Sequence, residues 1–254
     1  MQTGFEKLNE YFDKIFILSL PSLPERIDYI TNTCTGLNYE FFWGIDKALT
    51  SLEELKQQNL YNKERYNSLY QKRENINLGM LCCSLGHLNI YKEIIQKGYK
   101  RTLILEDDVI PVFNNLMTLD STIKDIPSDW ELLYLGYEKN DLYGWKAFLK
   151  KNIYKYFPPY TDIRLNKTNF SNYYPIPVNA NISIAGYHDC THAYGVTLEG
   201  AKKLIEMQTP VAFNPDNLLA YMTSSKLLDG YIFRNRLFDQ RTAFKDSASS
   251  LTTS

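Results

Sequence analysis

The chain has 254 residues, of which 44% are hydrophobic and 22% are charged, and its formal net charge is −1. This length suits one large α/β domain or two small ones. The small net charge gives no overall attraction to nucleic acid or to an anionic membrane, and no apolar run approaches membrane-spanning length. These features exclude a nucleic-acid-binding protein and a transmembrane protein, whereas peripheral association with a membrane stays open.

Strands and helices are expected to alternate through the first 137 residues. The expected elements are a strand at 14–20, a helix from Pro24, a strand at 39–45, a helix at 51–61 with Ser51 as N-cap, a long helix at 77–98 ended by Gly98, a strand at 102–105, a helix at 114–126 and a strand at 131–137. Such alternation is typical of a mostly parallel sheet with helices on both faces. The sequence therefore predicts an α/β fold.

The second part of the chain is less regular. Residues 138–180 are rich in Tyr, Lys and Asn and match no structural pattern. Beyond them, the sequence predicts a strand at 193–197, a helix at 199–208, a helix from Pro215 and a strand at 231–238. The Ser- and Thr-rich residues 247–254 are expected to form a flexible tail.

Three adjacent carboxylates, Glu106, Asp107 and Asp108, follow the apolar strand expected at 102–105. In open α/β sheets, ligands bind beyond the carboxyl ends of the strands. Glu106 and Asp108 are spaced so that both can face one hard cation, Mg²⁺ or Mn²⁺, which prefers oxygen ligands. Two alternatives remain: a solvated loop in which one acid caps the next helix, or the nucleophile and metal ligand of a phosphohydrolase. The Asp-x-Asp-x-Thr pattern that such a phosphohydrolase would have is not evident in this sequence.

Two histidines and one further acid are candidates for the same site. His87 lies in the long predicted helix, where a histidine is by default a core or helix-packing residue. His192 follows His188 and Asp189 in a short polar cluster. His192 is either a metal ligand or a structural hydrogen-bonding residue. Asp216 follows Pro215 at a helix start, where it either favours the helix dipole or acts as a general base.

The cysteines and the N-terminus bear on the compartment. Cys34, Cys82, Cys83 and Cys190 show no zinc-site spacing, which favours free thiols in a reducing compartment. The N-terminal residues are charged and have no apolar signal core. The sequence therefore predicts a cytoplasmic protein. There is also no Gly-rich phosphate loop, so a bound diphosphate would be held by a metal and basic side chains.

Four blocks of the sequence, in this order, resemble glycosyltransferase family 25, which includes bacterial lipopolysaccharide glycosyltransferases and procollagen galactosyltransferases. They are "KIFILSLPSLPERIDYI", "GMLCCSLGHLNIYKEIIQKGYKRTLILEDDV", "CTHAYGVTLEGAKKLIEM", and "NPDNLL" together with "LFDQRTAFKDSAS". Together they span most of the chain. The family usually has Ser directly before the helix histidine, and Gly86 stands there in this chain, which puts a Ser-His hydrogen bond in doubt.

The resemblance implies a GT-A type fold in a single domain over 1–246. A Rossmann-like nucleotide-binding half at about 14–137 would be joined to an acceptor-side half at about 138–246. It also implies a UDP-sugar donor, commonly UDP-galactose or UDP-glucose, Mn²⁺ or Mg²⁺, and transfer with inversion to a hydroxyl of a glycan, lipopolysaccharide or protein acceptor. Because eukaryotic members carry secretory signals, we expect a bacterial or viral origin.

The resemblance and the residue patterns together give each candidate a role. We expect the metal at Glu106, Asp108 and His192, the nucleotide at Ser19, Leu20, Arg26, His87 and Asp107, and the general base at Asp216. Two rival functions remain. One is a non-catalytic protein that binds glycans through its tyrosines, and the other is a metal-dependent nucleotidyltransferase, for which "PSLPER" supplies only Arg26 as a basic phosphate ligand.

Overall fold

The computed structural model describes residues 4–71 and 75–241, so the tail expected at 247–254 lies outside the described residues. The helices are α1 (Phe5–Tyr11), α2 (Pro24–Thr33), α3 (Leu52–Gln57), α4 (Lys63–Leu69), α5 (Leu78–Lys97), α6 (Phe113–Leu116), α7 (Leu119–Thr122), α8 (Gly144–Tyr156), α9 (Lys167–Ser171), α10 (Leu198–Gln208) and α11 (Pro215–Ser224). Two short 3₁₀ helices lie at Lys47–Leu49 and Ile123–Asp125. The strands are β1 (Lys14–Ser19), β2 (Glu40–Trp43), β3 (Arg101–Glu106), β4 (Val109–Pro111), β5 (Leu132–Glu138), β6 (Ile176–Pro177), β7 (Ile182–Ile184), β8 (Asp189–Thr197), β9 (Gly230–Phe233) and β10 (Phe238–Gln240).

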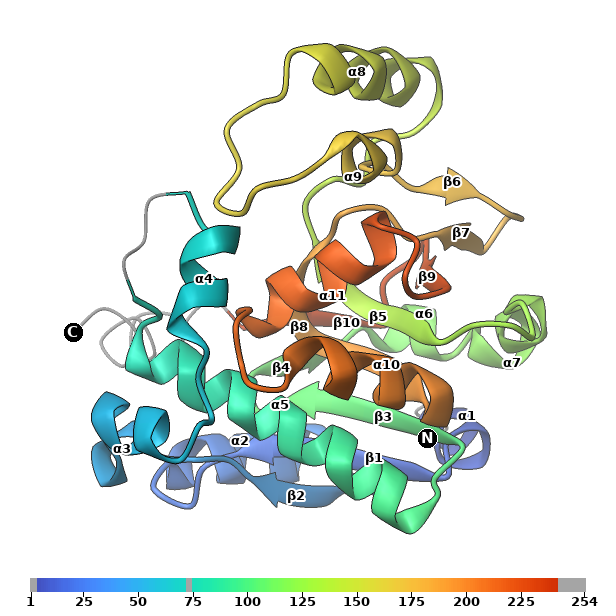
Figure 1. Ribbon diagram of the computed structural model, residues 1–254. Coiled ribbons are helices and arrows are strands. Elements are labelled where there is room, and N and C mark those ends of the chain that lie inside the picture. Colours follow the sequence, from blue (N-terminus) through green and yellow to red (C-terminus); the bar gives the residue numbers. More distant parts are fainter. Residues whose placement is uncertain (1–3, 72–74, 242–254) are drawn as a thin grey trace.

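An 8-stranded sheet with the order β2-β1-β3-β8-β5-β9-β7-β6 forms the centre of the molecule (Figure 1). Strands β2, β1, β3, β5, β9 and β6 run in one direction, and only β8 and β7 among the strands of this sheet run in the other. Strands β4 and β10 form a separate antiparallel pair. The sheet is therefore mixed but mostly parallel.

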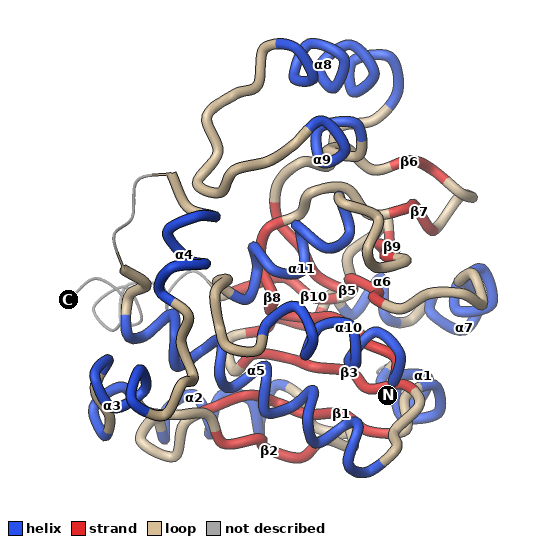
Figure 2. Tube along the Cα trace, viewed as in Figure 1, coloured by secondary structure: helices blue, strands red, loops and turns tan. Residues whose placement is uncertain are grey.

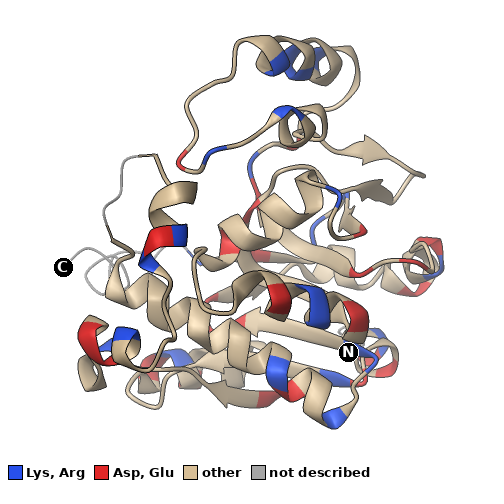
Figure 3. Cartoon of the chain, in the orientation of Figure 1, with Lys and Arg blue, Asp and Glu red and all other residues tan. Residues whose placement is uncertain are grey.

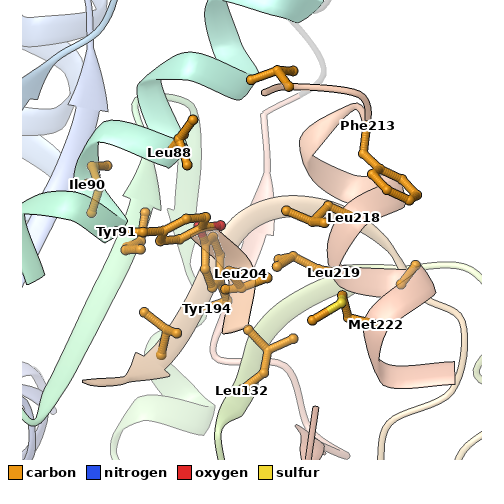
Figure 4. Close-up of a cluster of buried hydrophobic side chains, with 14 of the residues drawn as sticks. Leu88, Ile90, Tyr91, Leu132, Tyr194, Leu204, Phe213, Leu218, Leu219 and Met222 are labelled. Atoms are coloured by element: carbon orange, nitrogen blue, oxygen red, sulfur yellow. The ribbon is translucent and has the colours of Figure 1, made fainter. Parts of the chain in front are cut away.

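Helices cover both faces of the sheet, as Figure 2 shows. In β1, Phe16 and Leu18 point into a core with α5, α10 and α11, whereas Ile15 and Ile17 point into a second core with α1 and α2. Successive side chains of a strand point to opposite faces, so a strand buried on both faces must be apolar throughout. Figure 4 shows the first core, where Tyr91 of α5 lies beside Tyr194 of β8. The α/β architecture predicted from sequence is confirmed.

Helix α5 begins and ends where local chemistry favours it. The Asn77 side chain accepts hydrogen bonds from the backbone N–H groups of Gly79 and Met80, which have no partner within the helix. Gly98 closes the helix with φ of 70°, a left-handed conformation that glycine adopts without steric penalty. The predicted helix at 77–98 is confirmed to within one residue at each end.

Two predicted elements are wrong. The helix expected at 114–126 is instead α6, α7 and a 3₁₀ turn. The hydroxyl groups of Thr118, Ser121 and Thr122 donate hydrogen bonds to nearby backbone carbonyls. Such bonds compete with continuous helix. The strand expected at 231–238 is split into β9 and β10, because the polar residues between them leave the central sheet and β10 pairs with β4.

The second part of the chain contributes to the middle of the sheet. Strand β8 lies between β3 and β5, and it is antiparallel to both. The expected nucleotide-binding and acceptor-side halves therefore share one sheet. In the ranges 4–71 and 75–241, no helix combines the length and apolarity needed to cross a membrane.

Candidate functional site

The candidate site lies at the edge of the sheet where β1, β2, β3 and β5 end. Ser19 and Glu106 are the last residues of β1 and β3. Because β8 is antiparallel to β3 and β5, its first residues reach this same edge. The acidic triplet at 106–108 thus lies beside Thr191 and His192, although more than eighty residues separate them in sequence.

Asp107 is held by β1 and α2. Its Oδ2 accepts a hydrogen bond of 2.6 Å from Ser19 Oγ, and its Oδ1 pairs at 2.6 Å with Arg26 Nη1. Burial raises the pKa of Asp107 above its usual range, although Arg26 and Ser19 act in the opposite direction. This arrangement fixes Arg26 at the site but already uses both oxygens of Asp107.

Glu106 is held by β8 and α5. Its Oε1 accepts a hydrogen bond from Thr191 Oγ1 and lies 3.4 Å from His87 Nε2. The other ring nitrogen of His87 lies 2.8 Å from Tyr194 Oη, which in turn contacts Tyr91 Oη at 2.7 Å. Burial alone would raise the pKa of Glu106, but His87, and then Thr191, outweigh it and hold the pKa below its usual range. Glu106 is therefore an ionised, oriented carboxylate.

Asp108 is the least satisfied of the three acids. It is 5% exposed, its Oδ2 accepts a 3.0 Å hydrogen bond from Gln240 Nε2, and its Oδ1 has no hydrogen-bond partner among the described residues. Burial, followed by the charges of Glu106 and Asp107, raises the pKa of Asp108 to about 7. A buried, unpaired carboxylate oxygen beside two other acids is a place where a cation would be stabilised.

His192 lies close to this group but faces the C-terminal strand. Its Nε2 is 3.3 Å from the carbonyl oxygen of Phe238, and its Nδ1 is buried without a partner in the described part of the chain. Gly136 leaves room for the ring, since a Cβ there would lie 2.2 Å from His192 Nε2. Burial lowers the pKa of His192, so the ring is neutral and able to act as a ligand.

The metal-ligand geometry differs from the expected set. Within residues 4–71 and 75–241, the trio whose ligand atoms all lie within 4.8 Å of one another is Cys83, His87 and Glu106. Glu106, Asp108 and His192 do not form such a trio. The thiol of Cys83 and the ring of His87 suit a softer ion such as Zn²⁺ better than Mg²⁺. Burial raises the pKa of Cys83, so the thiol stays protonated without a metal.

Two cavities open at this edge of the sheet. The first cavity, of about 170 Å³, lies at the ends of β1, β2 and β3 and is lined by Ser19, Leu20, Arg26, Asp46, Lys47, Gly86, Glu106 and Asp107, among others. Gly86 faces Leu18 there, and a Cβ on Gly86 would approach Leu18 Cδ1 to 3.1 Å. The glycine that replaces the expected Ser thus lets α5 lie close to β1 at this cavity.

The second cavity, of about 550 Å³, lies beyond the first turn of α5 and contains Asp216. Its wall also includes Asn77, Met80, Lys139, Asn140, Tyr160, Thr161, Tyr187 and Asp189. Gly79 lines the first cavity, whereas its neighbours Asn77 and Met80 line the second. The first turn of α5 therefore separates two adjacent spaces.

Asp216 has the properties of a base that works near neutral pH. Burial, followed by the charge of Asp189, raises the pKa of Asp216 to about 6. Asp189 itself pairs with Lys139 Nζ at 2.5 Å. Lys139, Asn140 and Cys190 all have left-handed backbone conformations although none is glycine. Such strained residues gather at functional sites, where the surrounding structure holds them in place.

Comparison with known proteins assigns the family. The family model described as "Glycosyltransferase family 25 (LPS biosynthesis protein)" matches residues 12–219. The chain belongs to glycosyltransferase family 25. Its fold is accordingly the α/β, GT-A type that the sequence resemblance implied.

Family 25 relatives are similar to this chain over part of their length. Human procollagen galactosyltransferase 2 is 27% identical over 199 residues, covering 76% of this chain and 27% of the relative. A human relative named inactive glycosyltransferase 25 family member 3 is 23% identical over 202 residues, covering 78% of this chain and 29% of the relative. The chain therefore spans less than a third of the length of these two relatives. A solved glycosyltransferase involved in glycosylation of the PBCV-1 major capsid is 12% identical, with a TM-score of 0.41 over 94% of this chain and 99% of the other.

The structure adds residues to this family 25 site that sequence reasoning missed. Asp46 and Lys47 follow β2, and Lys139 and Asn140 follow β5, so the strand-end rule that selected the acidic triplet would also have selected them. Thr191 and Gln240 could not be found that way. They reach Glu106 and Asp108 only because β8 is antiparallel and β10 pairs with β4.

Proposed function

We propose that this protein is a metal-dependent glycosyltransferase that moves a hexose, galactose or glucose, from a UDP-sugar to an acceptor hydroxyl with inversion. One observation carries the proposal: two adjacent cavities flank the first turn of α5, with Glu106 and Asp107 on one side and Asp216 on the other. A single-step inverting transfer needs the leaving diphosphate and the attacking oxygen on opposite faces of one carbon atom. Two adjacent cavities provide that arrangement.

In this proposal, the first cavity holds the nucleotide. Arg26, fixed by Asp107, and Lys47 are basic side chains that line this cavity. Their positive charges attract the diphosphate. The apolar residues Leu20, Leu23 and Ile45 offer a surface for the flat base. The names of the family 25 relatives favour galactose as the transferred sugar.

One observation supports the binding of a hard cation at the acidic triplet. Asp108 Oδ1 is buried without a hydrogen-bond partner in the described ranges, and burial, followed by the charges of the neighbouring acids, raises the pKa of this residue. Asp108 and Glu106 would hold the cation, whose remaining positions suit phosphate oxygens and water. The cation would offset negative charge on the diphosphate. His192, whose Nδ1 has no hydrogen-bond partner within residues 4–71 and 75–241, remains a candidate ligand.

The second cavity holds the acceptor. An acceptor oxygen attacks the anomeric carbon while the bond from that carbon to the UDP oxygen breaks, and Asp216 takes the acceptor proton. A carboxylate with a pKa of about 6 is ionised at neutral pH yet basic enough to accept a proton late in the transfer. The polar, tyrosine-bearing wall of this cavity suits a sugar hydroxyl, whether on a glycan, a lipopolysaccharide or a glycosylated protein.

Thermal-shift measurements with UDP-, GDP- and CDP-hexoses and a CMP-sugar, each with and without Mn²⁺, test the proposal. A ligand that binds only the folded state raises Tm. We expect UDP-galactose or UDP-glucose to raise Tm only when Mn²⁺ is present. A parallel series with Zn²⁺ determines whether the Cys83, His87 and Glu106 trio takes the metal instead.

The same panel separates the rival functions. No shift with any nucleotide sugar would contradict the proposal and favour a non-catalytic glycan-binding protein. A larger shift with a nucleoside triphosphate than with any nucleotide sugar would favour the nucleotidyltransferase. Release of UDP in the presence of an acceptor then measures turnover directly.

A further inference from the structure

Helix α8 exposes a continuous apolar face. The exposed side chains recur at three- and four-residue steps along the helix, which places them on one side of it. They are Trp145 (69% exposed), Phe148 (60%), Leu149 (48%), Ile153 (54%) and Tyr156 (74%), followed by Phe157 (78%). We call this set the α8 apolar face. Large apolar patches of this kind on a protein surface mark binding sites.

The opposite side of α8 attaches the helix to the molecule. Ala147 is buried, and the ring of Tyr154 contacts those of Phe170, Tyr173 and Tyr174. Figure 1 shows α8 beyond α9, at the end of the molecule farthest from β2. The α8 apolar face therefore points away from the protein.

Lysines border the α8 apolar face. Lys146, Lys150, Lys151 and Lys155 lie on α8, and residues 142–161 contain no acidic residue. Figure 3 shows this basic helix, which contrasts with the net charge of −1 for the whole chain. By helical periodicity, Lys146 and Lys150 flank one side of the apolar face, and Lys151 and Lys155 flank the other. Long lysine side chains can bury their stems and keep the ammonium group in water.

We propose that α8 docks this protein on the surface of an anionic lipid membrane. An amphipathic helix with aromatic residues on one face and lysines at its borders lies in the plane of the membrane interface, with its apolar side chains among the acyl chains. Anionic headgroups complement the four lysines. A second copy of this chain, packed face to face, would instead bring lysines against lysines. A glycan is a poorer fit, because the helix surface is convex rather than concave.

Docking through α8 also orients the second cavity. Lys139 and Asn140 precede α8, Tyr160 and Thr161 follow it, and all four line the cavity that contains Asp216. A docked α8 therefore holds that cavity next to the membrane. Membrane docking itself does not depend on the proposed function. The further point, that an acceptor held in the membrane would reach Asp216, does rest on the proposed function.

Flotation with vesicles of phosphatidylcholine, alone or mixed with phosphatidylglycerol, tests the docking without any nucleotide present. We expect the protein to float with the anionic vesicles only, to be released by high salt, and to show a blue shift of Trp145 fluorescence. Replacing Lys150→Gln and Lys151→Gln together should weaken binding at least about tenfold. Replacing Trp145→Ser and Phe148→Ser should abolish flotation.

Matched variants elsewhere on the surface serve as controls. Met117→Ser removes an apolar side chain that is 64% exposed, and Lys202→Gln removes an exposed lysine of α10. Both should float like the wild type. The inference is overturned if the folded wild type does not float with anionic vesicles, or if the α8 variants float like the controls. Self-association that light scattering detects and Trp145→Ser abolishes would also overturn it, in favour of a second copy. The nucleotide thermal shift, measured on the same variants, reports separately on the proposed function.

Discussion

Of the three acids at 106–108, Asp108 has, in the described part of the chain, the fewest hydrogen-bond and ion-pair partners to stabilise its negative charge. Its Oδ1 is buried with no hydrogen bond among the described residues, and Glu106 and Asp107 add repulsion. Replacement by an amide of the same shape removes the charge and keeps the volume. The residue therefore separates a metal-binding role from a packing role.

We predict that Asp108→Asn lowers transfer about a hundredfold or more and leaves the fold intact. The reason is that the variant loses the carboxylate that would neutralise the metal, whereas the hydrogen bond position toward Gln240 remains occupied by a polar group. Turnover across a Mn²⁺ titration and a far-UV circular dichroism melt measure the two effects. Wild-type turnover at limiting Mn²⁺ would show that Asp108 does not hold the metal.

Asp216 gives a prediction about pH. A base must be ionised, so kcat should fall tenfold per pH unit below a pH of about 6, the pKa that burial and Asp189 impose on Asp216. Asp216→Asn should lose about 10² to 10⁴ in kcat and the inflection with it, while the UDP-sugar thermal shift is retained. Loss of that thermal shift instead would mean that Asp216 serves donor binding.

The same residue affects stability with a defined sign. The pKa of Asp216 is raised from 3.8 to about 6 in the folded state, so the folded state binds its proton more tightly than the unfolded state does. The stability this contributes is fully present below pH 3.8 and is lost as pH rises through about 6. Asp216→Asn should therefore melt at a higher temperature than the wild type at pH 8 but not at pH 4. An equal Tm difference at both pH values would contradict the pKa shift.

At the scale of elements, α5 is specified by its own sequence. Its apolar periodicity lies within the helix and its cap residues Asn77 and Gly98 directly adjoin it, which is why the prediction was accurate. Two wrong predictions also have local causes. At 114–126, side-chain hydroxyls compete with the backbone for hydrogen bonds, and around Arg234 polar residues interrupt the strand. What local signals could not provide is the partner of each strand, so the pairing of β10 with β4 was not predicted.

The end of α5 offers an isolated test of helix capping. Among the residues that the structure describes, no atom lies within 4 Å of a Cβ built on Gly98, so a substitution there changes only backbone strain. Gly98→Ala should reduce the free energy of unfolding by about 1 kcal/mol, because a left-handed φ is unfavourable for alanine. Gly98→Asn should lose less, since Asn tolerates this conformation. Urea unfolding measures both, and equal stability of all three proteins would mean that the turn relaxes.

At the scale of the whole molecule, the sheet joins both parts of the chain. Strand β8, from the second part, is bonded to β3 and β5, from the first. The two parts therefore cannot unfold separately without breaking the centre of the sheet.

We expect one cooperative thermal transition, in which circular dichroism and tryptophan fluorescence coincide. A UDP-sugar at about a hundred times its Kd should stabilise the folded state by about 2.7 kcal/mol and shift both signals together. A nucleotide that produced no shift in the initial panel is the control. Separate transitions, with only one moved by the ligand, would show that the two parts unfold independently.

The sequence by itself determined the position of the acidic triplet and the α/β class. An apolar run buried on both faces predicts a central strand, and the residues that leave such a strand emerge at the ligand-binding edge of the sheet. It also marked Arg26 and Asp216, which lie at the two cavities.

Only the tertiary structure decided what surrounds those acids. Thr191 and His192 reach the site because β8 is antiparallel to its neighbours, and Gln240 reaches Asp108 because the chain crosses back to β4. The exposure of the α8 apolar face likewise depends on which side of α8 packs against α9. The alternation of strands and helices indicates a mostly parallel sheet, but the direction and partner of an individual strand and the docking of a helix arise from contacts between residues far apart in the chain, which local sequence patterns do not specify.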